Sequence, residues 1–317
     1  MLLLMVSPFA PAQKIDNVDR AGIVKEAAQT IAKNAYNASK VDWAKAEATA
    51  LEILASDDSD NGLNASVQYL VSKLEDGHSS YRMAVEGGGQ APLPPGGSFG
   101  PLMPRPIGEV DTSGRFPVVR VNAWGGGDGG AVRAAAASLR GALNQALEGK
   151  ACGLVVDFSS NSGGNMWPML AGLLPIFAEG LLGSFESADG KRMAIVSNGS
   201  GLALDGKPHY LNSPLLPAPR SLPEHVAILI GSRTASSGEI VALLLAAQSN
   251  SRTFGEATAG RSSANRAFRM PDGSSLVLTT AATIDRNGHK HWEPLAPDVR
   301  SDNALEAASA WLSEQCK

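Results

Sequence analysis

Two short, mostly apolar runs constrain the fold of this chain most, because each is followed by a turn rich in Gly or Ser. The runs are Gly153–Phe158 and Val226–Ile230, and helical periodicity follows the second over Glu239–Gln248. Strands without regular polar alternation are buried on both faces, which is typical of parallel sheets. Parallel neighbours need a crossover connection, and helices provide it. The sequence therefore predicts an α/β sheet with right-handed crossovers.

Further segments extend this pattern into an α/β core over residues 116–317. Phe116–Asn122 is predicted as a strand, and Ala131–Leu147 and Met169–Leu182 as helices. Near the C-terminus, the segments Ser274–Thr280 and Ile284–His291 lie around the turn residues Asp285-Arg286-Asn287-Gly288, which the second segment contains. This arrangement predicts a pair of antiparallel strands.

The first third of the chain has a different organisation. Apolar residues recur at helical spacing in three segments that precede Asp76-Gly77-His78, which predicts a helical bundle over residues 16–85. Gly and Pro dominate residues 86–115 and predict a loop. Residues 1–12 contain an apolar stretch followed by Ala10-Pro11-Ala12, the pattern of a signal-peptide remnant, although no basic residue precedes it. We therefore expect an exported protein, periplasmic or extracellular.

Composition excludes several function classes. The 317 residues carry 27 Lys and Arg against 31 Asp and Glu, a formal charge of −4, so the chain lacks the basic surface of a nucleic-acid binder. No apolar run approaches the ~18 residues of a membrane span. Cys152 and Cys316 form no metal or disulfide pattern, so free thiols are expected. No His spacing indicates a metal site, and the oligomeric state is not predicted.

Three turns carry residues that suit chemistry, and two of them also have a purely structural explanation. Ser236 lies between a predicted strand and a helix, beside backbone amides that suit an oxyanion, but Ser236-x-x-Glu239 is also a capping box. Gly163-Gly164 ends the turn after another strand, where backbone N–H groups can face a ligand or simply form a tight turn. His78 ends the bundle at a turn from which its imidazole can reach across a cleft.

A dinucleotide site is a competing interpretation. Gly125-Gly126-Gly127-Asp128-Gly129-Gly130 satisfies G-x-G-x-x-G between a strand and a helix, and Asp157 ends the next strand, where a ribose-binding acid is found. The pattern is weak, because a run of glycines matches many motifs by composition. It predicts an oxidoreductase in which this loop, and not Ser236, borders the main cleft.

Taken in order, four blocks resemble the tail-specific or C-terminal-processing serine peptidases, a family that includes the tricorn core protease and the nisin-resistance peptidases. The resemblance covers most of residues 16–300. The blocks are Asp76-Gly77-His78-Ser79, Leu154-Val155-Val156-Asp157-Phe158-Ser159-Ser160-Asn161-Ser162-Gly163-Gly164, Thr234-Ala235-Ser236-Ser237-Gly238-Glu239 and Gly255-Glu256-Ala257-Thr258-Ala259-Gly260-Arg261. Ser159 stands where the family usually has Arg, and the family's peptide-binding PDZ module is missing. The resemblance implies a crotonase-like (ClpP-like) α/β core.

One departure selects the mechanism that the resemblance implies. Arg261 stands at the position of the lysine base of the processing peptidases, and a guanidinium cannot accept a proton near neutral pH. The tricorn and nisin-resistance branches, whose base is the histidine of the first block, are the better match. The resemblance then implies Ser236 as nucleophile, His78 as base and Glu293, shortly before Pro297-Asp298, as its partner.

The remaining expectations concern the oxyanion and the substrate. Ser237 and the Gly163-Gly164 turn are expected to supply N–H donors, with Gly163 as the first choice. Arg261 is a candidate to bind a substrate carboxylate. We expect a peptide or protein substrate and no cofactor. The alternative within the same fold is a non-catalytic relative that binds peptides or apolar ligands.

Overall fold

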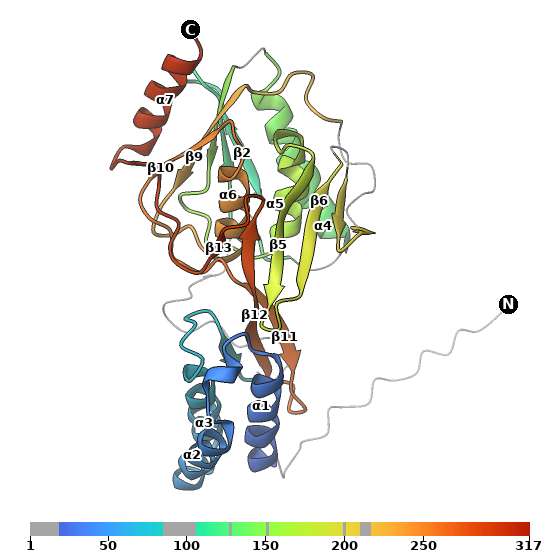
Figure 1. Ribbon diagram of the computed structural model, residues 1–317, viewed down its shortest axis with the longest axis vertical. Helices are drawn as coiled ribbons and strands as arrows, with labels where there is room; N and C mark the ends of the chain where they lie inside the picture. The colour runs from blue at the N-terminus through green and yellow to red at the C-terminus, as the bar shows by residue number, and fades with distance from the viewer. Residues whose placement is uncertain (1–18, 85–105, 127–128, 150–151, 199–200, 210–216) are drawn as a thin grey trace, which may run out of the picture.

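A computed structural model describes residues 19–84, 106–126, 129–149, 152–198, 201–209 and 217–317. The expected signal-peptide remnant and most of the expected Gly/Pro-rich loop lie outside these residues. The described chain forms a helical bundle and a larger α/β body, joined by a long β-hairpin (Figure 1). The predicted α/β fold class is confirmed.

Three helices and a short 3-10 turn form the bundle: α1 (Arg20–Asn34), the 3-10 turn (Ala38–Lys40), α2 (Trp43–Ser56) and α3 (Asp60–Ser72). A polar side chain caps the N-terminus of each helix, because Asp19, Asp42 and Ser59 accept hydrogen bonds from backbone N–H groups of the first turn. The inner faces bury apolar residues such as Ile31 and Leu70. The bundle ends just before the turn that carries His78.

The α/β body is built on a largely parallel sheet with the order β14-β10-β9-β4-β3-β2, in which β2 alone runs antiparallel to its neighbour. Its strands are β2 (Gly108–Asp111), β3 (Val118–Val121), β4 (Gly153–Asp157), β9 (His225–Ile230), β10 (Ser251–Gly255) and β14 (Val299–Arg300). Strand β2 lies within the range 86–115 that was predicted as a loop, so that prediction was wrong for residues 108–111. Its apolar and polar residues alternate too briefly to have been recognised.

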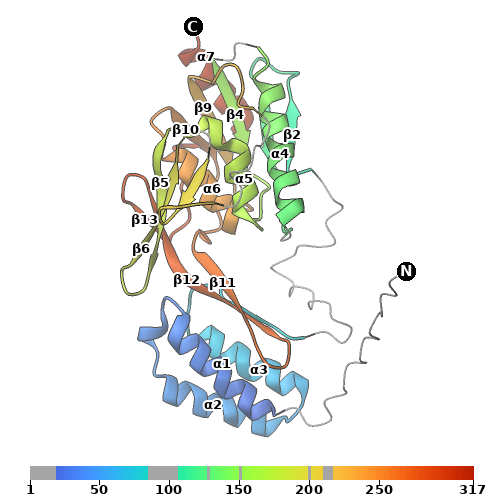
Figure 2. The same cartoon turned by 90° about the vertical axis from the view of Figure 1, so that its right-hand side faces the viewer.

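Helices cover both faces of this sheet (Figure 2). One face packs on α4 (Gly129–Ala146), α5 (Met166–Leu173) and α6 (Ser236–Ala246), and the other packs on α7 (Ala304–Gln315). The central strand β4 is buried at every residue, as the apolar run predicted. The helix expected over Met169–Leu182 is shorter, because a 3-10 turn around Pro175 ends it and Gly180 begins the next strand.

A second, antiparallel sheet has the order β1-β12-β5-β6-β7-β8, with β11 and β13 also paired to β12. Its strands are β1 (Ser80–Arg82), β5 (Gly180–Ser187), β6 (Arg192–Ser197), β7 (Leu202–Leu204), β8 (Lys207–Pro208), β11 (Ala264–Arg269), β12 (Ser275–Asp285) and β13 (Lys290–His291). The antiparallel pair expected around Asp285–Gly288 is present as β12 and β13, although β12 runs without a break from Ser275 to Asp285 and β13 has only two residues. The hairpin β11–β12 extends from the α/β body to the bundle, where Leu276 and Leu278 join the bundle's apolar core (Figures 1 and 2).

The two cysteines are not free thiols, contrary to expectation. Cys152, just before β4, forms a disulfide with Cys316 after α7, across 164 residues of sequence. No local pattern indicates this pairing, because only packing of α7 on the sheet brings the last residues of the chain back to the start of β4. The disulfide therefore links the end of α7 to the end of the sheet at which β4 and β9 begin.

Candidate active site

Ser236 lies where the chain leaves the carboxyl end of β9 and enters α6. It is the first residue of the helix and has a φ of +51°, a left-handed conformation that costs free energy for a residue with a Cβ. The surrounding backbone holds it there, because the N–H of Ala235 donates to the carbonyl oxygen of Asn161 at 3.0 Å. The serine hydroxyl therefore sits at a sharp strand-to-helix turn.

The turn after the bundle brings His78 to this serine. Asp76 accepts hydrogen bonds from the backbone N–H groups of His78 and Ser79 at 3.0 and 2.8 Å, which closes the turn. Gly77 adopts a φ of +61°, which suits a residue without a Cβ. The Nε2 atom of His78 lies 3.2 Å from Oγ of Ser236, so two groups 158 residues apart in sequence are in hydrogen-bond contact.

The other ring nitrogen of His78 contacts a residue that the sequence did not suggest. Its Nδ1 atom lies 2.8 Å from Oγ of Ser263, in the loop before β11. Glu293, expected as the partner of His78, is exposed, and among the described residues no hydrogen bond or ion pair joins the two. The segment of Glu293 instead passes over Gly260, where Pro294 leaves no room for a Cβ. The structure thus brings Ser236 and His78 together but leaves Glu293 outside.

The electrostatic surroundings keep the imidazole neutral. Burial lowers the pKa of His78 from its ordinary 6.5 to about 4; the Asp76 carboxylate opposes this shift and the Arg261 guanidinium adds to it. A neutral imidazole at neutral pH has a free lone pair on one nitrogen and can accept the proton of a hydroxyl.

The glycine turn approaches Ser236 closely. A Cβ on Gly163, whose φ is +107°, would lie 2.7 Å from Cβ of Ser236 and 3.1 Å from the backbone nitrogen of Ser237. The N–H of Gly163 is nonetheless engaged, because it donates to Oδ1 of Asn161 at 2.9 Å. Gly163 as first choice of oxyanion donor is therefore not supported, since an N–H already bonded inside the protein is not free for a ligand.

Gly164 and Ser237 fit the donor role better. Oγ of Ser237 donates to the carbonyl oxygen of Gly164 at 2.7 Å, which fixes the two segments against each other. Within the described part of the chain, neither backbone N–H has an acceptor. Gly164 is also exposed, whereas Gly163 is buried. An unengaged backbone N–H group is a donor of the kind that can stabilise an oxyanion.

Glu239 does not cap α6 as a capping box requires. No side chain caps this helix, and the buried carboxylate of Glu239 accepts from the hydroxyl of Thr258 and from the N–H groups of Gly260 and Arg261. Burial raises the pKa of Glu239. The result is that Arg261 is anchored by its backbone to the first turn of α6, next to Ser236. Its side chain is exposed and forms no ion pair among the described residues.

Asp157, the acidic residue of the dinucleotide interpretation, is engaged inside the protein. Asp157 accepts from the N–H and Oγ of Ser159 at 2.9 and 2.6 Å and pairs with Arg120 of β3 at 3.2 Å. Arg120 thereby supplies, from the neighbouring strand, a guanidinium near the place where Ser159 replaces the family's arginine. Part of the glycine run, residues 127–128, lies outside the described residues.

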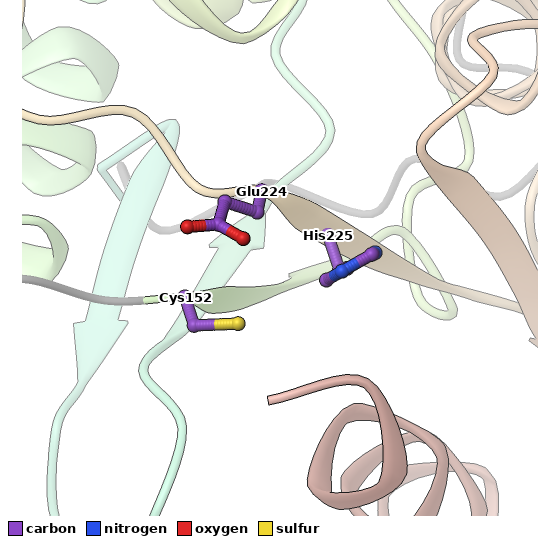
Figure 3. Close-up of side chains that lie close together, drawn as sticks. All are labelled: Cys152, Glu224 and His225. Atoms are coloured by element: carbon purple, nitrogen blue, oxygen red, sulfur yellow. The ribbon is translucent and has the colours of Figure 1, made fainter. Parts of the chain in front are cut away.

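One group of side chains has the composition of a metal site. Ligand atoms of Cys152, Glu224 and His225 lie within 4.8 Å of one another (Figure 3). The sulfur of Cys152 is bonded to Cys316, so it is not a thiolate that can bind a metal ion. The group also lies where β4 and β9 begin, whereas Ser236 follows the end of β9. It takes no part in the candidate site.

A turn-borne serine, a histidine in contact with it and two unengaged amides are features of the α/β hydrolytic enzymes that act through a serine nucleophile. Comparison with known proteins gives the family. The model of peptidase family S41 matches residues 116–301, and the chain belongs to this family.

Individual relatives agree with this assignment. The chain is 33% identical over 174 residues to the nisin-resistance protein of Lactococcus lactis subsp. lactis; the match covers 52% of this chain and 51% of that protein, so it spans about half the length of this relative. The fold is similar to that of a lipoprotein from Streptococcus agalactiae, with a TM-score of 0.74, 20% identity and coverage of 99% and 100% of the two chains. It is also similar to the photosystem II D1 C-terminal processing protease, with a TM-score of 0.60, 15% identity and coverage of 93% and 98%.

Proposed function

We propose that this protein is a serine peptidase in which Ser236 is the nucleophile and His78 the general base. The observation that carries the proposal is the 3.2 Å contact between Nε2 of His78 and Oγ of a serine in a left-handed conformation. Membership of family S41 supports peptide bonds as the substrate. Glu293 has no role in this proposal, because it does not contact His78.

The proposed reaction has two halves. His78 Nε2 takes the proton of Ser236 Oγ as the oxygen attacks the peptide carbonyl carbon, and the oxyanion accepts from the N–H groups of Ser237 and Gly164. His78 then returns the proton to the leaving amine, and the acyl group stays on Ser236. A water molecule, deprotonated by His78, releases the acid product and restores the serine.

The position of Arg261 indicates which part of a peptide substrate the enzyme recognises. It is exposed, free of acidic partners among the described residues, and held by its backbone beside the first turn of α6. A guanidinium binds a carboxylate through two parallel hydrogen bonds. We therefore propose that Arg261 binds the terminal carboxylate of a peptide, so that the enzyme trims carboxyl termini. A peptide amide should then be cleaved about tenfold less well than the free acid, and Arg261→Lys should lose most of this difference.

The central experiment is to incubate the protein with a complex peptide mixture and identify new termini by mass spectrometry. Ser236→Ala should abolish the new termini, whereas Ser232→Ala, a change at an exposed serine of the same loop, should keep them. The pattern of termini would also separate carboxy-terminal from internal cleavage. An unchanged mixture with all three proteins would contradict the peptidase proposal and favour a relative that only binds peptides or apolar ligands.

We also propose that the protein is exported. The Cys152–Cys316 disulfide supports this, because disulfides persist mainly in oxidising compartments. The similarity to a protein described as a lipoprotein supports it as well. No helix in the described ranges is long and apolar enough to cross a membrane. Fractionation of the native host with thiol labelling tests the proposal, and a reduced protein in the cytoplasm would contradict it.

A further inference from the structure

The contact between Nδ1 of His78 and Ser263 leads beyond the proposed function, on which the following inference rests. In the serine peptidases that use a triad, a carboxylate orients the histidine. We propose that Ser263 is the positioning residue of His78, and that a hydrogen-bond chain from Ser263 through Thr279 to the side-chain amide of Asn265 fixes the imidazole in the form with its proton on Nδ1.

The direction of this chain follows from one acceptor. Nδ2 of Asn265 lies 3.2 Å from the carbonyl oxygen of His78, which can only accept a hydrogen bond. The amide group must therefore present its NH2 to His78 and its oxygen, Oδ1, to Thr279. Oδ1 also can only accept, so the hydroxyl of Thr279 donates to it over 3.1 Å.

The remaining hydrogen bonds then have only one consistent direction. With its proton directed at Asn265, Thr279 Oγ1 accepts from the hydroxyl of Ser263, 3.3 Å away. Ser263 has thereby used its proton, so it must accept at its contact with His78, over 2.8 Å. The proton of that contact belongs to Nδ1 of His78. Its Nε2 consequently carries the lone pair, directed at Ser236.

Such fixation is needed because a neutral imidazole in water favours the opposite form, with the proton on Nε2, which cannot accept from Ser236. Thr279 is fully buried, and Ser263 is 6% exposed. Water therefore has little access to these hydroxyl groups and does not reverse the direction of their hydrogen bonds. The position of Thr279 is fixed further, because its N–H donates to Oγ of Ser79, the residue after His78, at 2.9 Å.

The charged groups around His78 do not replace Ser263. Asp76, on the same turn, accepts from the N–H groups of His78 and Ser79 and from the hydroxyl of Ser79, so both of its oxygens are engaged within the turn. Arg261, near the ring on the side of α6, is a cation and cannot accept a proton from Nδ1. Ser263 is thus the one acceptor that contacts Nδ1 among the described residues.

The first test compares kinetics of Ser263→Ala, Ser263→Thr and Glu293→Gln with a substrate found in the mass-spectrometric experiment. Ser263→Ala should lower kcat about tenfold to a hundredfold with KM nearly unchanged, because the lone pair at Nε2 is no longer enforced. Ser263→Thr, which keeps the hydroxyl, should restore most of kcat. Glu293→Gln should change kcat less than about twofold. Wild-type kcat in Ser263→Ala, or a large loss in Glu293→Gln, would overturn the proposal.

The second test does not depend on peptidase activity. Nitrogen-15 NMR of the histidine-labelled full-length protein reports which ring nitrogen carries the proton, and His78→Gln identifies the resonances of His78. The wild type should show a protonated Nδ1, and Ser263→Ala should shift the population toward a protonated Nε2. The same populations in both proteins would overturn the role of Ser263. If the wild type cleaves no peptide, this measurement still decides about Ser263, so the two proposals fail separately.

Discussion

Ser236 and His78 meet at their reactive atoms, but the chain supports them differently. The surroundings of Ser236 come mainly from two strand-to-turn segments, Phe158–Asn165 and Gly231–Glu239, which follow adjacent parallel strands. Those of His78 come from the end of the bundle, the loop before β11 and the middle of β12. The first arrangement follows from one parallel sheet. The second exists only while the hairpin holds the bundle against the α/β body.

This difference predicts that substitutions near Ser236 mainly lower the catalytic rate. Substitutions in the elements that support His78 should lower both the stability of the protein and the catalytic rate.

Gly163→Ala should have the largest effect. The added Cβ would lie 2.7 Å from Cβ of Ser236, at a φ of +107°. Displacing the nucleophile from its amides should lower kcat/KM about a hundredfold to a thousandfold, the range for loss of an oxyanion donor. Gly190→Ala is the matched control, because its φ is +80° but nothing lies within 4 Å of the added Cβ. Equal losses in both variants would show that backbone strain alone is responsible.

Leu278→Ala should affect the side of His78. Leu278 is fully buried where β12 joins the core of the bundle, so its truncation should cost about 2–4 kcal/mol of stability. Since the bundle carries His78, kcat of the folded enzyme should also fall, by about tenfold. Leu312→Ala, an equally buried truncation on the inner face of α7, should cost similar stability and keep kcat. Thermal unfolding and kinetics of Leu278→Ala and Leu312→Ala test this difference. Equal kcat values in the two variants would contradict the dependence of His78 on the packing of the hairpin.

The pH profile tests the surroundings of the imidazole. Activity requires neutral His78, and its pKa is lowered to about 4 by burial, with Arg261 adding to the shift and Asp76 opposing it. Activity should therefore persist as the pH falls to about 5 and be lost through about 4, whereas an ordinary histidine would leave about a tenth at pH 5.5. The same shift contributes stability that is fully present above pH 6.5 and is lost as pH falls toward 4. An acid limb near 6.5 would contradict the burial of His78.

Removal of the disulfide should affect activity least. The double variant Cys152→Ser with Cys316→Ser should lose roughly 2–4 kcal/mol of stability, because the bond closes a long loop of the unfolded chain. The bond lies where β4 and β9 begin, away from the ends at which Ser236 and Gly163 lie. kcat measured below the unfolding temperature should therefore change less than about twofold. A large loss of kcat would show that the two edges of the sheet are coupled.

Local pattern was sufficient for the parts of the site that follow strands. The apolar runs of β4 and β9 predicted buried parallel strands, and residues after their carboxyl ends lie together because parallel strands end at one edge. Ser236, Ser237 and Gly164 were predicted in this way, and they stay proposed site residues. The choice of Gly163 failed on one hydrogen bond, since the side chain of Asn161 folds back on its N–H. No spacing in the sequence reveals such a contact.

The partner of His78 illustrates the opposite case. Family pattern pointed to Glu293, but the described structure places Ser263 on Nδ1 through a loop that precedes a strand and carries no motif. The disulfide was missed for the same reason, because its cysteines meet only when α7 packs on the sheet.

Periodicity, glycines and chain order were thus enough to define the α/β class, the helical segments and the strand-end turns, because these depend on near neighbours along the chain. The partners of side chains from distant segments depend on how the hairpin, the bundle and the last helix pack. Packing selects among acceptors of similar chemistry by distance and burial, and a linear sequence contains neither quantity.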